Sequence, residues 1–307
     1  MDIFIQQLIN GLTLGAVYAV VALGYTMVYG IIQLINFAHG DVVMVGAMVA
    51  FSVIGALAPS GPAPLVIVLV ATGCAVSACM LIGYAMERLA YRPLRGAPRL
   101  APLITAIGVS IILQHLAMMI WSRNPLAFPQ IIKTQSYDIG GATVTNVQIA
   151  ILAISIAIMA GLVALVYRTR LGTAMRATAQ NPQVAGLMGI DANRVIAFTF
   201  VIGAALAAVA GVMVASYYGI AHYAMGSQLG LKAFCAAVLG GIGNIPGAML
   251  GGVLLGLVEA LGAGYIGDLT GNVFGSNYQD VFAFIVLIGV LVLRPSGLLG
   301  ERVGDRA

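Results

Sequence analysis

The sequence predicts an all-α polytopic membrane protein with about eight or nine transmembrane helices. Three observations support this fold class. Of the 307 residues, 61% are hydrophobic and 8% are charged, whereas about a quarter of the residues in an ordinary soluble domain are charged. Long uncharged segments exceed the roughly 20 residues that a helix needs to cross a bilayer. The 39 glycines and the single tryptophan favour closely packed helices over a β-barrel with aromatic girdles.

Charged residues, prolines and glycines divide the chain into nine expected spans. These spans cover residues 10–30, 42–57, 65–86, 101–121, 147–167, 195–217, 228–239, 247–265 and 281–293. Some helices are therefore expected to be short or broken, and a topology with eight spans is the alternative. Small residues recur four apart, as at Gly11 and Gly15, which is typical of close helix packing in membranes. We expect the whole chain, 1–307, to form a single transmembrane domain.

A polar break separates the first two expected spans. At residues 33–41, the side chains of Asn36, His39 and Asp41 interrupt an otherwise apolar sequence. Transporters use discontinuous helices with polar residues to expose backbone groups to a substrate. The three residues are therefore candidates for a substrate path. The alternative is an ordinary turn, in which Asp41 stabilises the start of the next helix.

A second break follows the sixth span, at residues 221–227, and it contains Gly226. The spans before the two breaks are expected to run in opposite directions, so the halves of the chain form a possible inverted repeat. Lys232 and Glu259 lie in the apolar segments that follow, where a charge facing lipid costs about 2.5–3.5 kcal/mol. Both side chains should therefore face protein or water, and we favour a structural role for each. Gly226 and Lys232 complete the candidate substrate path.

Arginines concentrate in three regions that connect or follow the spans: 88–99, 168–194 and the tail after residue 293, which includes Arg302 and Arg306. Loops rich in Lys and Arg stay in the cytoplasm. Nine alternating spans then place the C-terminus in the cytoplasm and the N-terminus on the outer side. With eight spans, the N-terminus would lie inside instead.

Several function classes lack the residues that their chemistry requires. Segment 240–247 is glycine-rich, but Pro246 replaces the third glycine of a dinucleotide-binding loop, and no Gly-Lys pair of an ATP-binding P-loop occurs. We interpret it as a tight turn with Pro246 in the first turn of the next helix. The histidines and cysteines are scattered, and Ser110 and His115 would not face one another on a helix. We therefore expect no catalytic residue, metal site, bound cofactor or nucleic-acid partner.

The basic loop 168–194 contains a predicted surface helix. Asn181 can cap its start, Pro182 suits its first position and Gly189 can end it. The helix presents three apolar side chains, spaced three and four residues apart on one face: Val184, Leu187 and Met188. Such a ridge suits a groove on a partner protein. The alternative is a helix that rests on lipid.

Five segments make the chain resemble the H-type permease of the bacterial branched-chain amino acid ABC transporter. They are YTMVYG at 25–30, INFAHG at 35–40, ERLAYRPLR at 87–95, RVIAFTFVIGAA at 194–205 and KAFCAAVLGGIG at 232–243. The resemblance spans nearly the whole chain, and the loop 122–146 is its least similar part. It implies a multi-pass subunit of the bacterial inner membrane that imports leucine, isoleucine or valine. The outer side, on which the basic loops place the N-terminus, is then the periplasm.

The resemblance also implies the partners of this chain. They are a second, different permease, two cytoplasmic ATPases that use ATP, and a periplasmic amino acid binding protein. The loop 168–194 matches the family's cytoplasmic coupling region, so six of its residues are expected to contact an ATPase or shape that contact: Arg176, Asn181, Pro182, Ala185, Leu187 and Gly189. Related permeases for urea or short amides, and an ATP-independent channel or secondary transporter, remain as alternatives.

Overall fold

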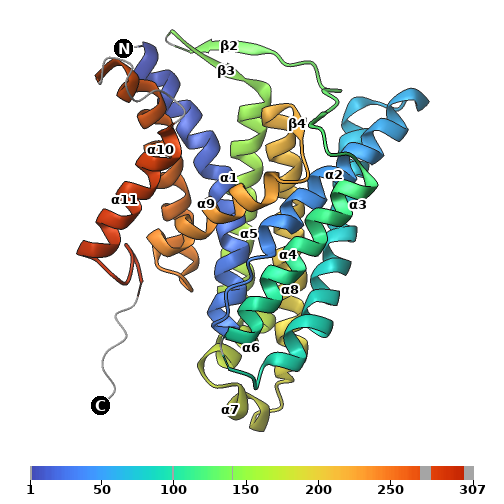
Figure 1. The fold of residues 1–307 in the computed structure, drawn as a ribbon, viewed down its shortest axis with the longest axis vertical. Helices are drawn as coiled ribbons and strands as arrows, with labels where there is room; N and C mark the ends of the chain where they lie inside the picture. The colour runs from blue at the N-terminus through green and yellow to red at the C-terminus, as the bar shows by residue number, and fades with distance from the viewer. Residues whose placement is uncertain (1, 99, 140, 270–277, 301–307) are drawn as a thin grey trace. The chain divides into compact units, whose positions relative to one another are not determined.

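The computed structural model describes residues 2–98, 100–139, 141–269 and 278–300, and within them the fold is almost entirely helical (Figure 1). The nine expected spans correspond to the following helices: α1 (Asp2–Ile32), α2 (His39–Leu57), α3 (Pro64–Ala85), α4 (Leu100–Ile120), α5 (Asn146–Arg168), α8 (Ala192–Tyr218), α9 (Met225–Gly240), α10 (Ile245–Leu269) and α11 (Gln279–Leu293). The prediction of an all-α polytopic membrane protein is therefore confirmed.

Seven of the helices in the described ranges are long and apolar enough to cross a membrane. They begin at Ile3, His39, Pro64, Leu100, Asn146, Ala192 and Ile245. Helices α9 and α11 are shorter, which agrees with the expectation of short helices. Arg302 and Arg306, which contributed to the predicted orientation, lie outside the described residues.

Several smaller elements were not predicted. Helix α3 continues through a π-helical turn, η2 (Met86–Tyr91), into the short 3-10 helix η3 (Arg92–Leu94), and another 3-10 helix, η1 (Ala58–Ser60), follows α2. The surface helix α6 (Arg170–Gln180) was also not predicted, whereas α7 (Pro182–Leu187) is the surface helix predicted in the basic loop.

Two small antiparallel ladders connect the helices. Strand β1 (Leu126–Ala127) pairs with β4 (Ile220–Ala221), with Leu126 opposite Ala221. Strands β2 (Ser136–Ile139) and β3 (Ala142–Thr145) form a hairpin just before α5.

The chain forms two compact units, and the boundaries between them lie within α1, α5 and α9 and in the loop between Lys133 and Thr134. Unit 1 comprises Met1–Thr26, Thr134–Met159 and Lys232–Ala307. Unit 2 comprises Met27–Lys133 and Ala160–Leu231. Each unit is described below by itself.

Helices α2, α3 and α8 pack against one another as the core of unit 2. Glycines allow this close approach: a Cβ atom added to Gly46 on α2 would lie 2.6 Å from Ala208 Cα on α8, and one added to Gly83 would lie 2.7 Å from Ala204 Cβ. Surface helix α7 and strand β4 lie at opposite ends of this unit (Figure 1). The small residues of these helices therefore bring their backbones together, as is typical of membrane bundles.

In unit 1, the first part of α1 packs closely against α10. A Cβ atom on Gly15 would lie 2.7 Å from Val253 Cα, and one on Gly11 would lie 2.9 Å from Leu257 Cα. The predicted role of the small residues of α1 in close packing is thus confirmed. Helix α9 ends at Gly240 and α10 begins at Ile245, so segment 240–247 contains the predicted tight turn.

Candidate functional site

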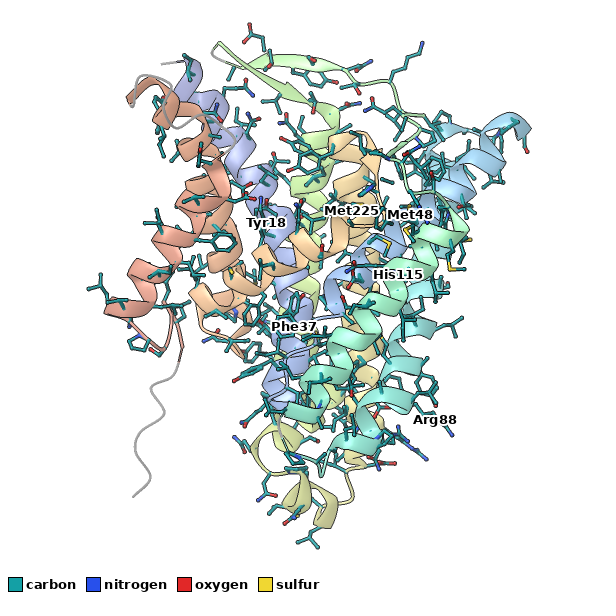
Figure 2. The ribbon with its side chains drawn as sticks, viewed as in Figure 1. Tyr18, Phe37, Met48, Arg88, His115 and Met225 are labelled. Carbon is teal, nitrogen blue, oxygen red and sulfur yellow. The ribbon has the colours of Figure 1, made fainter. Side chains whose placement is uncertain are left out.

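The first polar break is an irregular segment between α1 and α2 in unit 2. Gln33 adopts a φ of 52°, which is uncommon for a residue other than glycine, and α2 resumes at His39. Asn36, His39 and Asp41 are all buried, although each carries a polar side chain. Figure 2 labels Phe37 within this break. The predicted interruption is therefore present, and it lies inside the protein.

Side chains from η2 and α4 provide partners for the polar groups of the break. The hydroxyl of Tyr91 donates a hydrogen bond to Asn36 Oδ1 at 2.9 Å. The amide of Gln114 on α4 donates one to Asp41 Oδ1 at 3.0 Å. Because a buried polar group without a partner is costly, these bonds hold the break in one conformation. Tyr91 and Gln114 were missed in the sequence because they lie far from the break along the chain.

The second break meets the first one in unit 2. A Cβ atom on Gly40 would lie 2.7 Å from Gly230 Cα, and one on Gly226 would lie 2.9 Å from Asp41 Cα. The first turn of α9 therefore touches the start of α2, and both backbones need glycine at this contact. The structure thus brings Gly226 against Asp41, another member of the predicted substrate path, which follows Asn36 and His39 in the first break.

Lys232, the fifth residue of the predicted path, belongs to unit 1. Its ammonium group lies 2.7 Å from Glu259 Oε1 on α10 and 2.6 Å from Asp280 Oδ1 on α11. The hydroxyl of Tyr18 donates a hydrogen bond to Glu259 Oε2 at 2.9 Å. Both charges inside the apolar segments therefore face protein, as predicted, and they connect α1, α9, α10 and α11.

The basic loop of unit 2 folds into α6 and α7. The side chain of Arg176 on α6 donates a hydrogen bond to the carbonyl of Val166 and lies over the ring of Tyr167. Asn181 caps α7, as predicted, by accepting hydrogen bonds from the backbone amides of Gln183 and Val184. Arg176 thus attaches α6 to the end of α5, and Asn181 fixes the start of α7.

Helix α7 presents the predicted apolar ridge. Leu187 is 86% exposed, Met188 79% and Val184 53%. Ala185 is buried, and Gly189 follows the helix with a φ of 83°. Of the six residues predicted to serve coupling, Leu187 is placed for direct contact with a partner, and the others shape α6 and α7. Their role in coupling stays a prediction.

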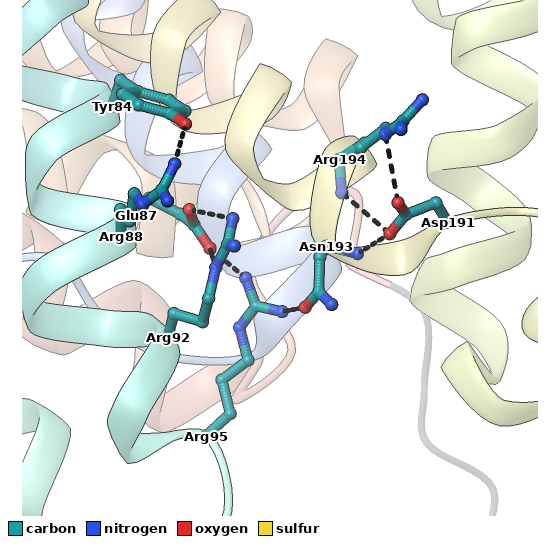
Figure 3. A network of polar contacts seen from close by, with 8 residues as sticks. All are labelled: Tyr84, Glu87, Arg88, Arg92, Arg95, Asp191, Asn193 and Arg194. Atoms are coloured by element: carbon teal, nitrogen blue, oxygen red, sulfur yellow. Dashed lines mark hydrogen bonds and ion pairs between the residues drawn. The ribbon is translucent and has the colours of Figure 1, made fainter.

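The buried carboxylate of Glu87 lies on η2 and is linked through Arg95 to the start of α8. Glu87 accepts hydrogen bonds from Arg92, with 2.8 Å between Arg92 Nη2 and Glu87 Oε2, and from Arg95 (Figure 3). Arg95 also donates to the side chain of Asn193. Burial lowers the pKa of the Arg95 guanidinium, and the Glu87 carboxylate opposes that shift. We name these four residues, Glu87, Arg92, Arg95 and Asn193, the Glu87 cluster.

The Glu87 cluster was missed in the sequence, although the lone acid within the basic run ERLAYRPLR is a usable signal. It places the two basic loops at the same end of unit 2, because Arg95 and Asn193 come from different loops.

Among the described residues, no three His, Cys, Asp or Glu side chains group closely enough to hold a metal ion.

Comparison with known proteins places this architecture in one family. Residues 7–291 match the model described as branched-chain amino acid transport system / permease component. The chain is 48% identical over 304 residues to the high-affinity branched-chain amino acid transport system permease protein BraD of Pseudomonas aeruginosa. It is 45% identical to the LivH permease proteins of Salmonella typhimurium and Escherichia coli. Each alignment covers 97% of this chain and 96% of the relative.

No solved structure matches the chain significantly. The family model nevertheless extends from α1 to α11, and the relatives align along almost their full lengths. The chain therefore belongs to the family of permease components of branched-chain amino acid transport systems.

Proposed function

We propose that this chain is one permease subunit of an ABC importer for leucine, isoleucine and valine in the bacterial inner membrane. The observation that carries the proposal is its identity of 45–48% to BraD and LivH along nearly the whole chain. A second, different permease completes the path, two cytoplasmic ATPases hydrolyse ATP, and a periplasmic binding protein delivers the amino acid. The chain itself acts as a conduit without covalent chemistry.

The ridge of α7 is the proposed contact with an ATPase. Its three exposed apolar side chains suit a hydrophobic groove on a partner protein. Asn181 caps α7, and Arg176 attaches α6 to the end of α5. A displacement of α7 by a bound ATPase would therefore be transmitted to the membrane-spanning helix α5. Closure of the ATPase dimer on ATP would in this way drive alternating access.

The substrate path is proposed to run, in unit 2, through the point where the two breaks meet. Lys232 is the residue of unit 1 that is proposed to line it. The side chains of Asn36, His39 and Asp41 are buried. Opening a path there requires the first turn of α9 to move away from Gly40. Irregular backbone at membrane depth is tolerated where it is covered by protein or lines a cavity, which fits such a contact.

The proposed orientation places the basic loops in the cytoplasm. The loops that carry Arg95 and Asn193 meet at one end of unit 2, and strand β4 lies at the other end. Basic loops are retained on the cytoplasmic side during insertion. The ridge of α7 would therefore face the ATPases, with the N-terminus in the periplasm and the C-terminus in the cytoplasm.

A charge placed on the ridge tests the coupling proposal. In Leu187→Glu, the exposed position should tolerate the new side chain during folding, but the carboxylate would have to enter an apolar groove without a partner. We expect co-purification of the ATPases with the tagged permease to fall at least tenfold, with unchanged amounts of permease in the membrane. Gly186→Glu is the matched control, since an added Cβ at Gly186 meets nothing within 4 Å and points away from the ridge.

Equal recovery of the ATPases with Leu187→Glu and with wild type would contradict the docking assignment. Recovery of the wild-type chain without any ATPase, from membranes that preserve other complexes, would favour an ATP-independent channel or carrier. Uptake of urea or acetamide in preference to leucine by the assembled complex would assign the chain to the short-amide permeases instead.

A further inference from the structure

A cavity of about 460 Å³ opens at the end of unit 2 that carries the Glu87 cluster. It lies between the end of α3 and the start of α8. Its lining combines arginines with apolar side chains and consists of Tyr84, Arg92, Asp191, Asn193, Arg194, Ala197, Phe198 and Val201. The proposed transport path and the α7 ridge do not use this cavity.

The polar end of the cavity carries a net positive charge. Two arginines, Arg92 and Arg194, and one carboxylate, that of Asp191, line this end, which leaves a formal charge of +1. Figure 3 shows the two arginines with their carboxylate partners Glu87 and Asp191. The side chain of Arg194 is 82% exposed, and its contact with Asp191 uses Nε at 3.2 Å. Its two Nη groups can therefore donate to a phosphate, for which the planar guanidinium is well suited.

The other end of the cavity is apolar and belongs to membrane-spanning helices. Phe198 and Val201 are in the second and third turns of α8, and Tyr84 is in the last turn of α3. Seven residues separate Arg194 from Val201, which corresponds to about 10 Å along a helix. The lining thus changes from arginine to apolar over the distance that separates a lipid headgroup from the upper part of its acyl chains.

We propose that this cavity binds one anionic phospholipid, with its phosphate at Arg194 and Arg92 and an acyl chain along Phe198 and Val201. Basic pockets between transmembrane helices on the cytoplasmic side suit such headgroups. A soluble protein could reach the arginines but not the apolar wall, which lies on the bilayer side of them. The lining therefore favours a lipid over an ATPase as the occupant.

The test uses the purified full-length chain in a neutral detergent, with phosphatidylglycerol, phosphatidylcholine or inorganic phosphate added in turn. Native mass spectrometry would count bound lipids. We expect one phosphatidylglycerol to bind in clear preference to phosphatidylcholine, and Arg194→Gln to weaken that binding about fivefold, the effect of one basic residue near an anionic lipid. Arg170→Gln is the matched control, because it removes an exposed arginine from α6 outside the cavity.

A second variant tests the cavity while all charges are kept. Val201→Phe should fill the apolar end and reduce the binding of phosphatidylglycerol more than the binding of inorganic phosphate.

Equal binding of the two lipids to wild type, equal effects of Arg194→Gln and Arg170→Gln, or unchanged lipid binding by Val201→Phe would each overturn the proposal. Inorganic phosphate that displaces the lipid completely at millimolar concentration would indicate an ion site. Loss of ATPase association with unchanged lipid binding in Arg194→Gln would assign the arginines to a protein partner.

Discussion

Lys232→Met tests the buried charge pair that holds unit 1 together. The substitution keeps a long side chain but removes the cation that lies 2.7 Å from Glu259. Glu259 is 1% exposed. In the variant its Oε2 would keep the hydrogen bond from Tyr18, but its Oε1 would lose the ammonium group. A buried pair that loses one partner costs about 3–5 kcal/mol, because the remaining charge is left uncompensated. Asp280 is half-exposed, so its separate contribution is at most about 1 kcal/mol.

The expected loss of unfolding free energy for Lys232→Met is therefore about 3–5 kcal/mol. Reversible unfolding with SDS in mixed micelles, followed by circular dichroism, would measure it. The double variant Lys232→Met/Glu259→Gln should recover most of the loss, since the amide oxygen of Gln can still accept the bond from Tyr18 without a charge. A single variant within 1 kcal/mol of wild type, or a double variant no more stable than Lys232→Met, would refute this reasoning.

Three further substitutions test other contacts. Gly46→Ala should lower the free energy of unfolding by about 1–3 kcal/mol in the same SDS assay, because its new Cβ meets Ala208. The control Gly55→Ala, on the same helix, places its Cβ where nothing lies within 4 Å and should leave the stability of the protein unchanged. Asn181→Ala should cost about 1 kcal/mol in local stability of α7, seen as faster amide hydrogen exchange there, and Asn181→Asp should restore protection. Asn36→Leu should reduce leucine uptake by the assembled transporter at unchanged expression; unchanged uptake would remove Asn36 from the path.

The spans could be predicted from sequence because apolar length alone decides whether a helix crosses a bilayer. Their ends could not, since helix α1 begins at Asp2, eight residues before the expected start. Helix α6 was missed because its short sequence mixes polar with small apolar residues. In the structure Thr169 caps its start and Arg176 binds the carbonyl of Val166 at the end of α5. Strands β1 and β4 were missed because each has two residues and depends on a partner about a hundred residues away.

Some residues of the candidate site could also be predicted from the sequence, and others could not. Asn181 and Leu187 could be identified locally, because a cap and a helix face depend on neighbours within one turn. The bond from Tyr91 to Asn36 depends on helix packing, for which a single sequence carries no direct signal. Glu87 carries a local signal, as the lone acid in the run ERLAYRPLR, but the contact of its partner Arg95 with Asn193 depends on helix packing.

ATP-driven transport by the reconstituted complex tests the central claim most directly. The chain would be co-purified with its second permease and ATPases, incorporated into liposomes, and supplied with the loaded binding protein and radiolabelled leucine. We predict uptake that requires ATP and the binding protein, that excess isoleucine and valine suppress, and that urea leaves unchanged. Leucine uptake by this chain alone, without ATPases or ATP, would contradict the account.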